Sequence, residues 1–125
     1  MTIKVLIIDD SALVRRILTE IVRSQPDMEV VGVAPDPLVA RELIKQTNPD
    51  VLTLDVEMPG LDGFEVAAAI RASHGAGFPV VLVTGRSDPA FIAQAQALSA
   101  DYIAKPVNWP SLAGLLRAML GAVHC

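Results

Sequence analysis

The sequence predicts an α/β fold, with a doubly wound sheet of five parallel strands and helices on both faces. Short β-branched runs alternate with longer stretches of helical periodicity five times along the chain. The first run, residues 4–8, is continuously apolar, as expected of a strand that is covered on both faces. Right-handed crossovers would then place the strands in one parallel sheet.

The predicted strands are short apolar runs that are bounded by turn residues. They cover residues 3–8, 29–33, 50–55, 79–83 and 101–104. The predicted helices lie between these runs and after the last one. They cover approximately residues 11–25, 36–48, 64–72, 88–98 and 109–123.

Helix starts are marked by capping residues, and helix faces by apolar spacing. Asp10-Ser11 offers an N-cap for the first helix, and Asp36-Pro37 and Asp88-Pro89 combine a cap with proline at the first helical position. Apolar residues at helical spacing predict the core-facing sides of the first two helices. These residues are Leu13, Val14, Ile17, Leu18, Ile21, Val22, then Leu38, Val39, Leu43 and Ile44.

Length and composition predict one globular domain over residues 1–125, because 52% of the residues are apolar and 19% are charged. The net charge is −4 and the longest basic run is Arg15-Arg16, which argues against nucleic-acid binding. Cys125 is the only cysteine, so we expect no internal disulfide and no cysteine metal site. Without a signal peptide or an apolar run of about 18 residues, we expect a cytoplasmic protein with no membrane association.

Polar side chains stand at the ends of four of the five predicted strands. Asp9 and Asp10 follow the first strand, Asp55 ends the third, Thr84 follows the fourth and Lys105 follows the fifth. In open parallel sheets the carboxyl ends of the strands share one edge, where ligands bind. We therefore expect these five side chains to converge.

Each of these residues also has a structural explanation when it is taken singly. Asp10 could cap the next helix, Thr84 could bond to nearby backbone, and Lys105 could be a solvated loop residue. Asp9 and Asp10 are harder to explain in this way, because adjacent carboxylates repel unless a cation lies between them.

Together the five residues match the needs of one site for a divalent cation and a phosphoryl group. The acids Asp9, Asp10 and Asp55 would hold Mg2+, which prefers oxygen ligands. Lys105 would offset the acid charge and contact a phosphoryl oxygen, while Thr84 would donate to another. Asp55 would be the nucleophile, since a carboxylate can form an acyl phosphate.

This set of residues resembles the response-regulator receiver domains of two-component signalling, over essentially the whole chain. The matching motifs are Asp9-Asp10, Asp55 with Met58-Pro59, Asp62-Gly63, Thr84 and Lys105-Pro106. The resemblance implies a flavodoxin-like (βα)5 receiver fold and a phosphoacceptor that is phosphorylated by a histidine kinase or a phosphotransfer protein.

The same resemblance implies a role for each residue of the site. Asp55 would be the phosphoacceptor, Asp10 and Asp55 would bind Mg2+ directly, and Asp9 would act through water. The main-chain carbonyl of Glu57 would be a further ligand, and Tyr102 would match the family's rotating aromatic residue. An unidentified output protein would then bind the face formed by the fourth helix, the fifth strand and the last helix.

Residues 1–59 resemble most closely the receiver half of the chemotaxis methylesterase, whereas residues 60–125 resemble a generic receiver. The chain could therefore be a receiver fragment of such a larger regulator. No methylesterase catalytic sequence follows, so we expect no esterase activity. We expect no enzymatic turnover beyond self-catalysed phosphorylation and dephosphorylation of Asp55.

Two further features are specific to this chain. Glu57 and Arg86 flank the expected site, and we expect them to form an exposed ion pair that controls access of water to the phosphoryl group. Residues 109–123 contain Arg117 as their one ionisable residue, which predicts a partly apolar face for a partner or for weak homodimerisation.

Two other functions remain open at this point. A Mg2+-dependent phosphohydrolase also uses an aspartyl phosphate, but 125 residues leave little room for a substrate-recognition insertion. A nucleotide or flavin binder would need a glycine-rich phosphate loop after the first strand, where Asp9-Asp10 would repel phosphate instead.

Overall fold

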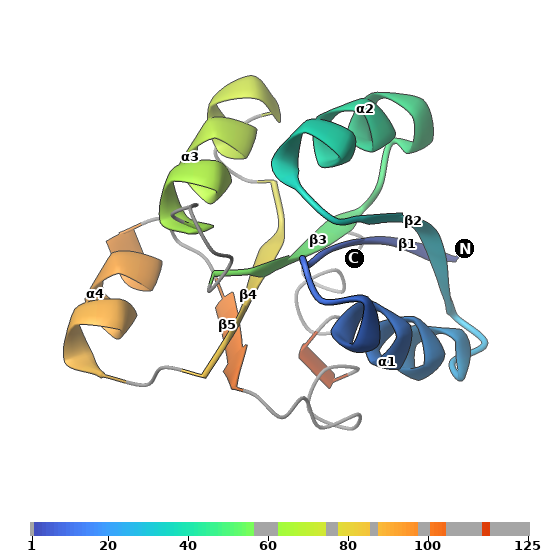
Figure 1. Ribbon diagram of the computed structural model, residues 1–125, viewed down its shortest axis with the longest axis horizontal. Coiled ribbons are helices and arrows are strands. Elements are labelled where there is room, and N and C mark those ends of the chain that lie inside the picture. Colours follow the sequence, from blue (N-terminus) through green and yellow to red (C-terminus); the bar gives the residue numbers. More distant parts are fainter. Residues whose placement is uncertain are drawn as a thin grey trace.

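The structure is a computed structural model in which residues 2–56, 63–74, 78–85, 88–97, 101–104 and 114–115 are described (Figure 1). Its strands are short and alternate with helices along the chain. In order, the elements are β1 (Ile3–Ile8), α1 (Ala12–Arg23), β2 (Met28–Ala34), α2 (Pro37–Thr47), β3 (Val51–Asp55), α3 (Gly63–His74), β4 (Val80–Thr84), α4 (Pro89–Ala97) and β5 (Asp101–Ala104).

The five strands form one parallel sheet in the order β2-β1-β3-β4-β5. This confirms the predicted fold class, and the predicted element boundaries differ from the observed ones by a few residues. β4, for example, ends at Thr84 and not at the predicted residue 83. The predicted last helix lies outside the described residues, except for Gly114 and Leu115, which are helical.

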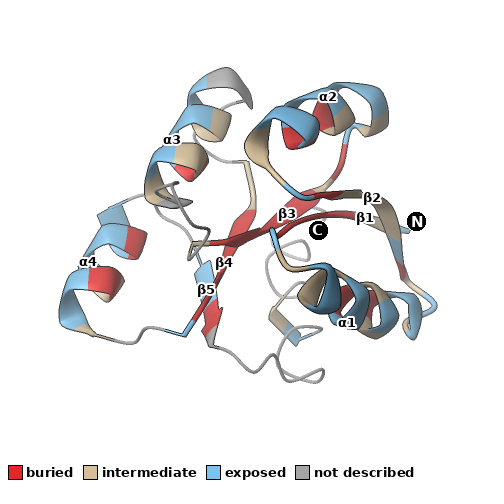
Figure 2. Cartoon of the chain, in the orientation of Figure 1, coloured by how far each residue is buried: buried red, intermediate tan, exposed pale blue. Residues whose placement is uncertain are grey.

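The sheet is covered on both faces, and each face has its own hydrophobic core. α1 packs on one face through Leu18 and Val22, against strand residues such as Val5 and Ile7. On the other face α2, α3 and α4 pack against alternate strand residues, with Phe91 of α4 fully buried among them. Figure 2 shows the buried strands between these helices. Burial on both faces explains why the strand sequences are continuously apolar.

Some apolar residues that were predicted to face the core are exposed. Leu13 and Ile17 of α1 are 66% and 43% exposed, and Leu38 and Val39 of α2 are 76% and 39% exposed. In α1 the core stripe consists of Leu18 and Val22 with partly buried neighbours, so the adjacent row of side chains points away from the sheet. The apolar surface of these helices is thus wider than their contact with the core.

Side-chain caps begin the helices as the sequence predicts. The Ser11 hydroxyl accepts a hydrogen bond from the Val14 N–H at 3.2 Å, so Ser11 and not Asp10 is the N-cap of α1. The Asp36 carboxylate accepts from the Val39 N–H at 3.0 Å. Within the described residues, no helix is both long and apolar enough to span a membrane.

Candidate metal and phosphoryl site

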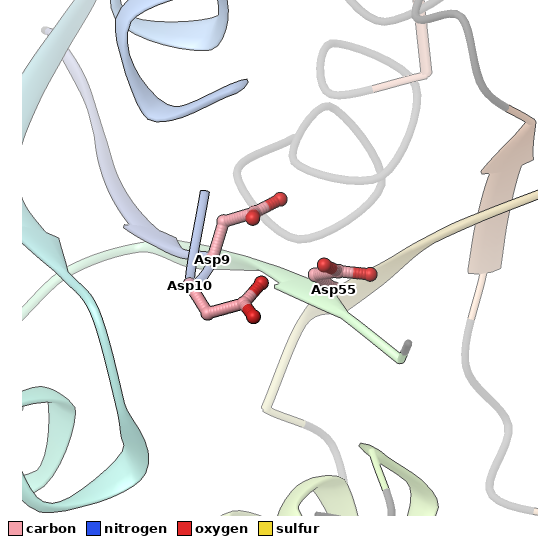
Figure 3. A group of neighbouring side chains, drawn as sticks. All are labelled: Asp9, Asp10 and Asp55. Carbon is pink, nitrogen blue, oxygen red and sulfur yellow. The ribbon is translucent and has the colours of Figure 1, made fainter. Parts of the chain in front are cut away.

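Three carboxylates meet at the carboxyl edge of the sheet. Asp9 and Asp10 follow β1, and Asp55 is the last residue of β3. The two strands are neighbours in register, with Ile8 opposite Leu54, so the acids that follow come side by side. One carboxylate oxygen from each of the three acids lies within 4.8 Å of the others (Figure 3).

The burial of these acids fits a cation-binding role. Asp9 is 1% exposed and Asp55 is 3% exposed, while Asp10 is open to solvent. Buried carboxylates need compensating charge or hydrogen bonds, and a third carboxylate close by increases that need. Three carboxylates form a hard-oxygen donor set, which Mg2+ prefers, and the open side at Asp10 leaves room for the water ligands that Mg2+ retains.

The turn between β1 and α1 is fixed by hydrogen bonds around Asp9. The Asp9 N–H donates to the Ala34 carbonyl of β2 at 3.0 Å. The Asp9 carboxylate accepts from the Ser11 N–H at 2.8 Å. The Asp9 main-chain carbonyl accepts from Arg15 Nη1 of α1 at 2.7 Å. No motif in the sequence marks Arg15 for this contact, although Arg15 lies one turn after the Ser11 cap, at the start of α1.

Asp10 does not cap α1, which was the structural alternative to a role in metal binding. Ser11 caps α1, so the carboxylate of Asp10 is not needed for that purpose. Asp10 lies instead in the acid group with Asp9 and Asp55. The capping explanation for Asp10 is therefore wrong.

Thr84 ends β4 at the same edge of the sheet and is fully buried. β4 is the neighbour of β3, with Asp55 opposite Val83, so Thr84 lies one residue beyond the level of Asp55. A hydroxyl and the acid group thus lie on adjacent strand ends.

Tyr102 of β5 is 40% exposed and contacts an aromatic residue that no motif in the sequence marks. Its ring meets Phe91 of α4 edge-on, with centroids 5.7 Å apart and an interplanar angle of 88°. Phe91 in turn packs against Phe64 of α3, with the two ring centroids 5.2 Å apart. The three rings connect α3, α4 and β5, and no local pattern in the sequence indicates this contact.

Other predicted residues of the site lie outside the described part of the chain. They are Glu57, Arg86 and Lys105. Their predicted roles, and the Glu57–Arg86 ion pair, therefore stay predictions. The partly apolar face that was predicted for residues 109–123 also falls there, apart from Gly114 and Leu115.

One pKa shift stands out, and it lies away from this site. Burial lowers the pKa of Arg71 in α3, and the neighbouring charge of Asp101 at the start of β5 opposes that effect. This interaction belongs to the amino-terminal end of β5, opposite to the edge that carries the acids.

Comparison with known proteins identifies the family. The family model of the response regulator receiver domain matches residues 5–117. A protein-glutamate methylesterase/protein-glutamine glutaminase of Thiobacillus denitrificans is 55% identical over 109 residues, which are 85% of this chain and 30% of that protein. Its counterpart in Methylobacillus flagellatus is 53% identical over 109 residues, with the same shares. The chain thus spans about 30% of the length of the curated relatives that it matches.

Solved structures agree with this assignment. The response regulator domain of Thermotoga maritima CheB has a TM-score of 0.85 and 35% identity, covering 97% of this chain and 98% of that one. Vibrio cholerae chemotaxis protein CheY4 has a TM-score of 0.85 and 28% identity, covering 95% and 99%.

The similarity to methylesterases extends further than expected from the sequence. The sequence predicts this similarity for residues 1–59, whereas the alignments cover 109 residues. The predicted resemblance to receiver domains is confirmed, and with it two-component signalling as the context. The chain belongs to the response regulator receiver domain family, the phosphoacceptor domains of two-component systems.

Proposed function

We propose that residues 1–125 form a single switch domain that accepts a phosphoryl group on Asp55 from a histidine kinase or a phosphotransfer protein. The observation that carries this proposal is the group of three carboxylates within 4.8 Å at the carboxyl edge of the sheet. Asp55 is nearly buried at the end of its strand, so its carboxylate is held rigidly beside the other two. A rigid, partly desolvated carboxylate is suited to act as a nucleophile.

Asp10 and Asp55 would hold Mg2+ directly, and Asp9 would hold it through water. When it is bound, Mg2+ supplies positive charge that offsets the phosphoryl oxygens and the carboxylates. A carboxylate oxygen of Asp55 forms a bond to phosphorus while the bond from phosphorus to the donor nitrogen breaks. The main-chain carbonyl of Glu57 is a further proposed ligand.

Thr84 and Lys105 are the proposed residues that respond to the new charge. The Thr84 hydroxyl donates a hydrogen bond to one phosphoryl oxygen, and the Lys105 ammonium pairs with another. Movement of Thr84 then changes the space beside Tyr102, whose exposed ring packs on Phe91. The surface around α4 and β5 would in this way change its affinity for an output protein.

The test is phosphorylation by a small acyl phosphate in the presence of Mg2+. We expect wild type to gain one phosphoryl group by intact-mass spectrometry, and to lose that ability when EDTA removes the cation. Asp55→Asn should gain none, whereas Asp36→Asn, which loses a carboxylate that caps α2, should behave as wild type. Modification of Asp55→Asn to the wild-type extent would refute the assignment of Asp55.

We further propose that the output is a methylesterase activity in chemotaxis. The supporting observation is that curated relatives with 51–55% identity carry the name protein-glutamate methylesterase/protein-glutamine glutaminase. A methylesterase catalytic domain from such a relative should change its activity when phosphorylated wild type is added, and should not respond to Asp55→Asn. The same response to both proteins would argue against this output.

A further inference from the structure

The position of the Asp10 carboxylate is not explained by a strand or a helix. Asp10 is open to solvent and lies in the turn between β1 and α1, outside any regular element. Yet its carboxylate reaches the same group as the buried Asp9 and Asp55 (Figure 3). An exposed turn residue ordinarily samples several orientations, which would weaken cation binding.

The two peptide groups that flank Asp10 are both held by hydrogen bonds. The peptide before it has its oxygen, the Asp9 carbonyl, bound by Arg15 Nη1 at 2.7 Å. The peptide after it has its nitrogen, the Ser11 N–H, bound by the Asp9 carboxylate at 2.8 Å. The Cα of Asp10 joins these two peptides, so its position is determined from both sides.

We propose that Arg15 is a positioning residue for the cation site, because its guanidinium holds the peptide that links Asp9 to Asp10. This inference rests on the proposed function of the acid group. Arg15 lies in the first turns of α1, and its own N–H donates to the Ser11 carbonyl. The side chain therefore ties the acid-bearing turn to the helix that follows it.

The charge of Arg15 would act in the opposite direction to its hydrogen bond. A positive charge near three carboxylates competes with a bound cation, so its removal by itself would tighten Mg2+ binding. Loss of the hydrogen bond frees the turn and weakens Mg2+ binding. The guanidinium contacts the main-chain carbonyl at 2.7 Å, so we infer that positioning outweighs the charge effect.

The experiment compares Mg2+ affinity by isothermal titration calorimetry in wild type and in variants of two adjacent arginines. Arg15→Ala should bind Mg2+ about tenfold more weakly, as is usual when an outer partner of a metal ligand is lost. Arg15→Met, which keeps an apolar stem for packing, should show the same loss. Arg15→Lys, which retains a charged donor, should recover part of the affinity.

Arg16→Ala is the matched control, because it removes the same charge from the next residue of α1. The Arg16 side chain is 79% exposed and pairs with Glu20 at 3.6 Å on the surface. Its removal should leave Mg2+ affinity within about twofold of wild type.

Amide hydrogen exchange without divalent cations supplies a second, metal-independent measurement. In Arg15→Ala the Ser11 amide should exchange faster than in wild type, while the amides of β1 keep their protection. Unchanged Ser11 exchange would overturn the inference, even for a protein that does not bind Mg2+.

The outcomes separate this inference from the proposed function. No Mg2+ binding by wild type would overturn the proposed cation site. Binding by wild type with equal or tighter binding by Arg15→Ala and Arg15→Met would overturn the positioning role of Arg15 and leave the cation site intact.

Discussion

Replacement of Asp10 by asparagine should stabilise the protein in the absence of Mg2+. In excess Mg2+ the same variant should be less stable than wild type. The substitution removes one charge from a group of three carboxylates whose oxygens lie within 4.8 Å of one another. Two like charges at that distance repel by about 1 kcal/mol in a water-like medium and by about 3.5 kcal/mol at an effective dielectric constant of about 20. Asp10 is exposed, so the lower figure applies. We expect Asp10→Asn to raise the free energy of unfolding by about 1 kcal/mol in EDTA.

In excess Mg2+, wild type should have a higher free energy of unfolding than Asp10→Asn. A cation at about 100 times its dissociation constant stabilises the folded state by about 2.7 kcal/mol. Wild type gains this stabilisation and Asp10→Asn loses it, so wild type becomes the more stable protein by about 1.7 kcal/mol. Urea denaturation in EDTA and in excess Mg2+ measures both differences.

Asp36→Asn is the control for the loss of one negative charge. Asparagine caps helices as well as aspartate does, so the hydrogen bond from the Val39 N–H is kept. We expect a change below about 0.5 kcal/mol, and the same Mg2+ response as in wild type. If Asp10→Asn destabilised the protein in EDTA, or kept the full gain from Mg2+, the electrostatic account of the acid group would be wrong.

Four other substitutions test the packing of the strands and helices. Thr53→Val should raise the free energy of unfolding by about 1–2 kcal/mol, because the Thr53 hydroxyl is buried and makes no hydrogen bond within the described part of the chain. Thermal denaturation of the variant and of wild type measures this difference. Gly32→Ala should cost about 1–3 kcal/mol, since the new Cβ would lie 2.7 Å from Leu6 Cδ1, whereas Gly114→Ala, whose Cβ meets no atom of the described residues within 4 Å, should not destabilise. Phe91→Leu should cost about 1–2 kcal/mol and shift the 19F resonance of fluorotyrosine at Tyr102, the only tyrosine, by removing its edge-on ring contact.

The fold could be predicted because its signals are local. β-branched runs, capping residues and Asp-Pro pairs each indicate the state of the residues around them, and they agree along the chain. The width of a helix's contact with the core is not local, because it depends on how the helix lies on the sheet. The apolar row of Leu13 and Ile17 therefore gave no sign that it would be exposed.

The acid group could also be predicted, whereas the residues that support it could not. Asp9 and Asp10 follow β1 and Asp55 ends β3, and parallel strands align their carboxyl ends. Arg15 contacts a main-chain carbonyl, and every residue has such a carbonyl, so the sequence does not mark which one a long donor side chain will reach. Phe91 has the pattern of an ordinary core residue, and its contact with Tyr102 depends on the packing of α4 against β5.

The strand order explains why the acids meet beside β1 and not elsewhere along the edge. From β1 the chain passes through α1 to β2 on one side, and β3 with the later strands lies on the other. The segments that leave β1 and β3 therefore lead to opposite faces of the sheet: α1 covers one face and α3 the other. In open parallel sheets, a divergence of this kind is the usual position of a ligand-binding crevice. Asp9, Asp10 and Asp55 stand at the two strand ends on either side of this point, so we expect the proposed phosphodonor to approach the Asp55 carboxylate from this edge of the sheet.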